Sequence, residues 1–274
     1  MTSPDSAADP FVAFKTAQRE TWKDFAALEH ATTPPAAELV RFAQVHAGDH
    51  ALDVGCGTGV VAVTAARTGA KVSGLDLTPV LLERARENAA IASVAVEFRA
   101  GDVEALPYAD ATFDVVLSQF GHMFAPRPDV TIAEMLRVLK PGGRIAFSTW
   151  PPEHGMGRLF TFVASQAPPP PGMAAPSPPA LWGDPTLVRE RLTERVRHVR
   201  FERGVMRVAA LSPEHRLHTM RATLGPLTRL LDSLDDQPAR VQTILAELLE
   251  LVREDFQGNM MHQHYLMTRA VKVA

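Results

Sequence analysis

Residues 52–59 read Leu-Asp-Val-Gly-Cys-Gly-Thr-Gly, and these residue types suit close contact with a ligand. An apolar run ends in Asp53, and glycines then occupy the first, third and fifth positions of a loop: Gly55, Gly57 and Gly59. Glycine lets a backbone approach a ligand closely because it has no Cβ. The helical pattern that follows would point its N-terminal amides at the same ligand.

Two common phosphate-binding loops do not fit this stretch. A dinucleotide fingerprint needs a glycine at the sixth position, where this chain has Val60. A P-loop needs a lysine followed by serine or threonine, and neither is present here. A sugar, an amino-acid group or a nucleoside therefore fits the loop better than a pyrophosphate.

Two further acidic residues follow predicted strands. Asp76 lies 17 positions after Gly59, close to where an acid meets ribose hydroxyls in nucleoside-binding α/β folds. A carboxylate suits that task because it can accept from two hydroxyls at once. Asp102 follows a third predicted strand, residues 94–99. A lone Gly-Asp pair more often marks a turn.

In this order and spacing, the motifs resemble those of the class I S-adenosylmethionine-dependent methyltransferases. The likeness is closest to the small-molecule branch that includes the quinone-biosynthesis C-methyltransferases, and it fades after Trp150. It implies S-adenosyl-L-methionine as cofactor, with Asp76 on the ribose, Asp102 and Val103 on the adenine, and the glycine loop near the methionine portion. The implied cofactor contacts are Asp53, Gly55, Cys56, Gly57, Thr58, Gly59, Asp76, Leu77, Asp102, Val103, Ser118 and Gln119.

The residues after the fourth predicted strand bear on the methyl acceptor. His122 lies at the end of the sheet where ligands gather, and its imidazole suits a general base, although a packed loop histidine is the alternative. Residues 118–121 depart from the Asn/Asp/Ser-Pro-Pro-aromatic motif of enzymes that methylate nucleic-acid bases and protein amides. We therefore expect transfer to oxygen or carbon of a hydrophobic or aromatic small molecule. The predicted substrate contacts are Trp22, Phe120, Met123 and Trp182.

Two other functions remain open at this stage: a non-catalytic S-adenosylmethionine-binding or regulatory protein, and a nicotinamide-dependent oxidoreductase. The missing sixth-position glycine counts against the oxidoreductase. Two histidine pairs, at 215 and 218 and at 262 and 264, lack the carboxylate or cysteine that would complete a metal site, so we expect no metal.

The chemistry-bearing residues require an α/β scaffold. Residues 53–150 alternate strand and helix, which predicts a Rossmann-like, doubly wound sheet of seven mainly parallel strands with an antiparallel last strand. We expect N-terminal helices over the cofactor site (1–48), a cofactor-binding core (49–150) and a proline-rich lid without a long helix (151–185). The remaining strands (186–274) would carry a helical substrate cap at about 211–257.

Composition bounds the partners. The 274 residues carry a formal net charge of −3 and one cysteine, which gives no electrostatic footprint for nucleic acid and no disulfide framework. No segment is apolar over the roughly 20 residues that a membrane helix needs. We expect a cytoplasmic protein, either a monomer or a homodimer.

Overall fold

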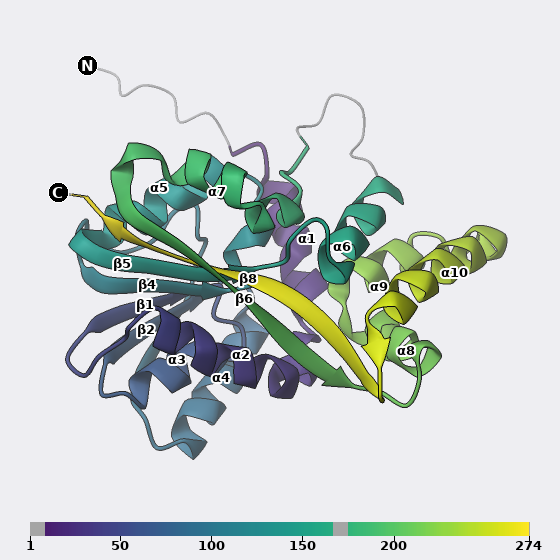
Figure 1. Ribbon diagram of the computed structural model, residues 1–274, viewed down its shortest axis with the longest axis horizontal. Helices are drawn as coiled ribbons and strands as arrows, with labels where there is room; N and C mark the ends of the chain where they lie inside the picture. The colour runs from purple at the N-terminus through teal and green to yellow at the C-terminus, as the bar shows by residue number, and fades with distance from the viewer. Residues whose placement is uncertain (1–8, 167–174, 274) are drawn as a thin grey trace.

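A mixed sheet forms the centre of the molecule in the computed structural model, which describes residues 9–166 and 175–273 (Figure 1). Part of the proline-rich segment, including the apolar residue Met173, lies outside the described residues. The strand order is β3-β2-β1-β4-β5-β8-β6, and the short β7 pairs with β8 off this path. The strands are β1 (His50–Val54), β2 (Lys71–Asp76), β3 (Val96–Ala100), β4 (Phe113–Gln119), β5 (Leu139–Thr149), β6 (Val196–Ala209), β7 (Phe256–Gln257) and β8 (Met260–Lys272).

The pairing confirms the predicted fold. Strands β1 to β5 pair in parallel, whereas β8 pairs antiparallel with both β5 and β6. Val115, Val116 and Leu117 of β4 are fully buried, because the middle of a parallel sheet is covered on both faces. The antiparallel last strand, β8, runs from Met260 to Lys272.

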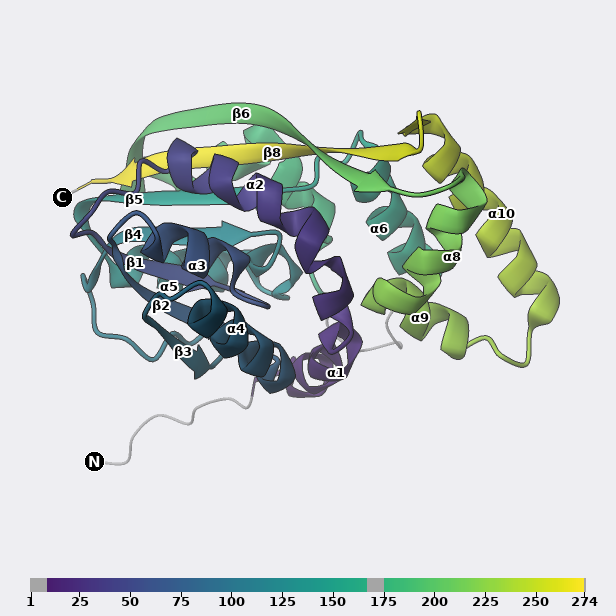
Figure 2. The ribbon, with the colours of Figure 1, turned by 90° about the horizontal axis from the view of Figure 1, so that it is seen from below.

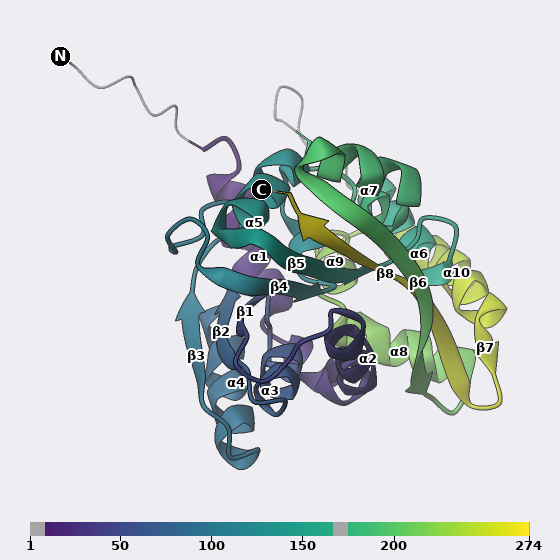
Figure 3. The same ribbon diagram turned by 60° about the vertical axis from the view of Figure 1, so that its left-hand side comes forward.

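Helices cover both faces of the sheet (Figure 3). One face carries α2 (Glu29–Phe42), α3 (Val60–Ala66) and α4 (Pro79–Ile91), and the other carries α5 (Pro128–Val138) and α7 (Pro185–Leu192). Beyond one end of the sheet lie α6 (Gly155–Gln166), α8 (Pro213–Thr223), α9 (Gly225–Asp232) and α10 (Pro238–Glu254) (Figure 2). Helix α1 (Val12–Trp22) packs against α9. None of the helices in the described ranges is both long and apolar enough to cross a membrane.

Two segments that proline would be expected to interrupt are helical. Helix α2 contains Pro34 and Pro35, because its apolar face at Ala36, Leu39 and Val40 is buried in the core and this packing outweighs the lost amide donors. Helix α6 occupies twelve residues of the predicted proline-rich lid, since no proline occurs between residues 153 and 167.

The loops after β1 and β4 meet backbone to backbone. A Cβ placed on Gly121 would lie 2.5 Å from the carbonyl oxygen of Gly55 and 2.9 Å from its Cα. Backbone atoms cannot swing away as a flexible side chain can, so this approach requires glycine. The contact fixes the distance between the two loops that bound the site.

We predict that Gly121→Ala lowers the free energy of unfolding by about 3 kcal/mol in urea titrations, because the new methyl group must push the two loops apart. The matched control is Gly142→Ala, whose Cβ meets nothing within 4 Å. It should cost only about 1 kcal/mol through its positive φ. Equal losses in the two variants would contradict the close-approach argument.

Candidate active site

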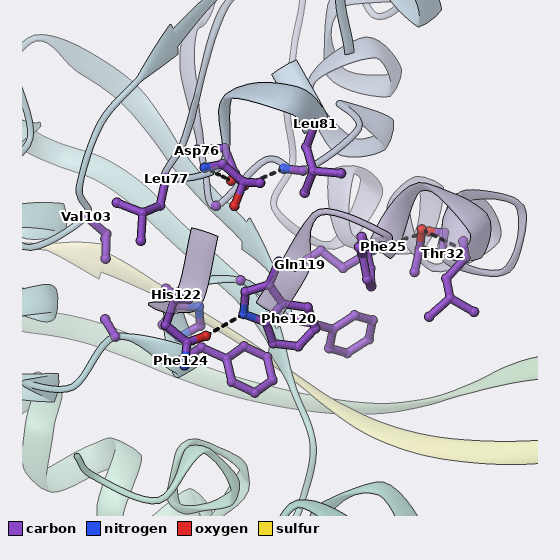
Figure 4. A pocket seen from close by; sticks show the side chains of 18 of the residues that line it. Phe25, Thr32, Asp76, Leu77, Leu81, Val103, Gln119, Phe120, His122 and Phe124 are labelled. Atoms are coloured by element: carbon purple, nitrogen blue, oxygen red, sulfur yellow. Dashed lines mark hydrogen bonds between the residues drawn. The ribbon is translucent and has the colours of Figure 1, made fainter. Parts of the chain in front are cut away.

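A single cavity opens at the carboxyl ends of β1, β2 and β4 (Figure 4). One end is lined by the glycine loop and by residues that follow β2, β3 and β4: Gly55, Gly57, Asp76, Leu77, Asp102, Val103 and Gln119. The other end is largely apolar and reaches α6, α8, β6 and β8: Trp150, Met156, Phe160, Met206, Val208, Arg216, Leu224 and Gln263. The two halves therefore share one space.

Asp76 closes the first half of the cavity at the end of β2. Its Oδ2 accepts a hydrogen bond from the amide of Gly57 at 2.8 Å, and its Oδ1 accepts one from the amide of Thr78 at 2.8 Å. Burial raises the pKa of Asp76, and these two amides oppose that rise. Each oxygen keeps a further lone pair, so the carboxylate can still accept from a ligand hydroxyl.

A smaller cavity lies behind the glycine loop and is lined by Asp53, Cys56 and Thr58 among others. Asp53 is fully buried, and its Oδ2 accepts from the amide of Ala62 at 3.0 Å in the first turn of α3. Burial raises its pKa to about 8. Its Oδ1 is buried and has no hydrogen-bond partner among the described residues.

The predicted cofactor residues Gly59 and Ser118 have supporting positions instead. Gly59 precedes α3 with φ +81° and lines neither of the two cavities. Ser118 is fully buried; its hydroxyl donates to the Val54 carbonyl at 2.6 Å and accepts from the His122 amide at 3.1 Å. It joins β1, β4 and the following turn, so it shapes the site from behind.

Asp102 belongs to a charged cluster that reaches back to α1. The Nζ of Lys15 lies 2.7 Å from Asp102, 2.6 Å from Glu104 and 2.6 Å from Asp9. Arg127 adds a second cation, 2.7 Å from Glu104. The hydrogen bonds to these carboxylates outweigh burial and raise the pKa of Lys15. The cluster fastens the N-terminal helix across the loop that holds Asp102 and Val103.

Phe120 marks the point where the two halves of the cavity meet. It has φ +57°, a left-handed conformation that non-glycine residues rarely adopt and that costs about 1–3 kcal/mol. Its ring stacks on Trp150 with centroids 3.9 Å apart and meets the edge of Tyr265 at 5.6 Å. Such strain concentrates at functional sites, where the surrounding packing holds it in place.

The predicted base, His122, lines the cavity but has its imidazole packed in the wall. The ring lies 4.7 Å from that of Phe147 and 4.6 Å from that of Trp182 between centroids. Neither ring nitrogen has a hydrogen-bond partner in the described parts of the chain. Burial lowers the pKa of His122 to about 3, so the ring is a weak base at neutral pH. This geometry disfavours a catalytic role.

Comparisons with known proteins identify the family of this chain. A family model described as a methyltransferase domain matches residues 52–147. A Mycobacterium tuberculosis protein of unassigned function is 35% identical over 261 residues, which span 94% of each chain. The 27-O-demethylrifamycin SV methyltransferase of Amycolatopsis mediterranei is 34% identical over 211 residues, which span 75% of this chain and 65% of the relative. The chain therefore carries a methyltransferase domain of the class I S-adenosylmethionine-dependent family.

A solved structure supports the same fold. The YcgJ protein of Bacillus subtilis superposes with a TM-score of 0.60 at 17% sequence identity, covering 90% of this methyltransferase and 99% of YcgJ. At that identity the likeness concerns the fold alone. The cofactor of the family is S-adenosyl-L-methionine, and the glycine loop with its buried carboxylate suits a nucleoside bound to an amino acid.

Two of the four predicted substrate contacts lie in the core of the methyltransferase. Trp22 and Phe120 line the cavity, so their role as substrate contacts stays a prediction. Met123 and Trp182 are fully buried and line neither of the two cavities, which corrects their prediction. The indole of Trp182 is held between His122 and the guanidinium of Arg191, so it supports the wall from outside.

Several cavity residues of the methyltransferase were not predicted from sequence. Lys15, Arg216 and Gln263 are polar residues inside segments whose apolar spacing was the dominant signal. Each is buried, with 9%, 5% and 1% of its surface exposed. A polar residue on the apolar face of an amphipathic segment could have indicated a cavity residue. A single sequence, however, does not say which faces of a segment are buried.

We predict that acid weakens the fold partly through His122. Because its pKa is lower in the folded protein than in the unfolded chain, the unfolded state binds more protons between pH 6.5 and about 3. Stability should therefore fall as pH falls below 6.5, by at most about 1.4 kcal/mol per pH unit from this residue. Urea titrations at pH 8, 6 and 5 should show a smaller loss in His122→Phe. An identical loss in both proteins would show that the imidazole is not held neutral by burial.

Proposed function

We propose that this methyltransferase moves a methyl group from S-adenosylmethionine to an oxygen or carbon atom of a hydrophobic or aromatic small molecule. The observation that carries this proposal is the single cavity with two unlike ends. One end holds the carboxylates of Asp76 and Asp102 and the glycine loop, and the other holds aromatic rings and methionines such as Trp150, Phe160 and Met206. A cofactor and an apolar acceptor can meet there, next to Phe120.

In this proposal, two carboxylates bind different parts of the cofactor. Asp76 accepts from the ribose hydroxyls through the lone pairs that Gly57 and Thr78 leave free. Asp102 accepts from the adenine amine, and the amide of Val103 donates to a ring nitrogen. The remaining glycine-loop residues, with Asp53, Cys56, Thr58, Leu77 and Gln119, surround the methionine portion and the sugar.

The peripheral segments serve as covers. Within the N-terminal segment, residues 9–48 close the cofactor end through α1, which Lys15 fastens to Asp102. Residues 151–166 and 175–185, with the helices within 211–257, enclose the acceptor end, to which α6 contributes Phe160 and α8 contributes Arg216. The name of the Amycolatopsis relative, a methyltransferase of 27-O-demethylrifamycin SV, supports an acceptor of the small-molecule class.

The residues of the cavity contribute to the reaction by positioning the acceptor and by excluding water. Bound S-adenosylmethionine supplies an electrophilic methyl group. Holding a nucleophile in line with it can account for much of the acceleration. The stacked rings of Phe120 and Trp150 form a rigid apolar wall for the acceptor, and the covers keep water away.

We predict that Asp76→Ala weakens cofactor binding at least tenfold in calorimetric titrations, because two charge-assisted hydrogen bonds to the ribose are lost. Asp76→Asn keeps the side-chain volume and separates loss of charge from loss of shape. Asp110→Ala removes an exposed carboxylate in the loop before β4 that lines neither cavity; it is the matched control and should bind as the wild type does. Unchanged affinity in Asp76→Ala, with a wild-type melting temperature, would reject the ribose assignment.

The acceptor class is tested with methyl-labelled S-adenosylmethionine and a cell extract. We expect label in an organic-extractable small molecule, and much less of it when Asp76→Ala replaces the wild type at a cofactor concentration below the wild-type Kd. Label on protein or RNA would overturn the acceptor class while leaving methyl transfer intact. Tight binding of S-adenosylhomocysteine without any labelled product would favour the non-catalytic alternative.

A further inference from the structure

Arg216 is a buried cation at the apolar end of the cavity. It lies in α8, only 5% of its surface is exposed, and it lines the cavity beside Met206, Val208 and Leu224. A guanidinium in such surroundings loses most of its hydration. That loss is costly unless a partner replaces the water.

The chain supplies almost no such partner. Within 9–166 and 175–273, no carboxylate forms an ion pair with Arg216; its Nε is buried without a hydrogen-bond partner. Its Nη1 donates to the hydroxyl of Thr219 at 3.3 Å. Thr219 lies one turn later on the same helix, so this bond holds no second element in place. Burial alone lowers the pKa of Arg216 to about 10, which leaves the group charged at neutral pH.

Lys15 shows how this chain treats a buried cation that has a structural role. Three carboxylates lie within 2.7 Å of its ammonium group, and they join α1 to the loop after β3. Arg216 has neither the neutralising charges nor the link between elements. Its position is explained instead if the missing charge arrives with a ligand.

The other polar group at this end points to the same kind of ligand. Gln263 is 1% exposed, and its Nε2 lies 3.1 Å from the Met156 sulfur and 3.5 Å from the Met261 sulfur. Thioether sulfur is a weak acceptor, so this amide remains available to a better one. Arg216 and Gln263 thus offer two donors in a space whose other walls are mainly apolar.

We propose that Arg216, assisted by Gln263, binds an anionic oxygen on the methyl acceptor, either a carboxylate or an acidic phenolate. The acceptor is then an apolar, flat acid: its ring system lies against Phe120 and Trp150 and its anionic group reaches α8. Guanidinium suits this role because its planar fork donates two parallel bonds to a carboxylate. The inference rests on the proposed function, since it assigns a substrate class to the same cavity.

The test compares two probes of equal shape, 2-naphthoate and the uncharged 2-naphthamide, by calorimetry on protein saturated with S-adenosylhomocysteine. We expect the wild type to bind the naphthoate at least tenfold more tightly than the amide. Arg216→Gln should abolish that preference, and Arg216→Lys should retain part of it. Arg221→Gln, an exposed residue on the same helix, is the matched control and should keep the full preference.

Equal affinity of the wild type for the two probes, binding of neither, or a preference that survives in Arg216→Gln would overturn the proposal. Each variant is first titrated with S-adenosylhomocysteine alone. This titration distinguishes failure of the Arg216 proposal from misfolding of the variant and from failure of the proposed function. Wild-type affinity for it shows that Arg216→Gln is folded. A wild-type protein that does not bind it would reject the proposed function together with the inference.

Discussion

The Asp76 carboxylate holds together the part of the molecule on which the site depends. One oxygen fixes the amide of Gly57 in the loop after β1, and the other fixes the amide of Thr78 at the start of α4. Two neighbouring βα connections are therefore locked to one buried charge. The close approach of Gly55 and Gly121 adds the connection after β4. The cavity is the space that these three fixed loops leave between them.

Sequence predicted the features that depend on short-range patterns. Neighbouring residues alone indicate the glycine loop, the acids after strands and the alternation of strands and helices. The predicted cofactor contacts were derived from these features. The direction of side chains after β4 is different. Phe120 adopts a left-handed conformation that no propensity indicates, and after it Met123 is buried in the core while the imidazole of His122 packs in the cavity wall. The substrate role predicted for Met123 could not be judged without that backbone geometry.

The acceptor end was harder to predict because it is assembled from distant segments. Its walls come from α6, α8, β6 and β8, which are joined only by the tertiary fold. The proline-rich composition of 151–185 hid the amphipathic helix α6, and the apolar periodicity of 213–224 hid a buried arginine. In both cases the average property of a segment concealed the residue or stretch that matters.

The two buried cations show how charge relates to mechanism in this fold. Lys15 is neutralised by the protein itself, so it contributes a latch whose strength does not require a ligand. Arg216 lacks such neutralisation, so its interaction energy is available to a bound anion. An acidic acceptor held by Arg216 would be fixed at its anionic end, and this would orient the rest of the molecule toward the methyl group. The apolar packing and low pKa of His122 agree with a site whose main contribution is to position the acceptor.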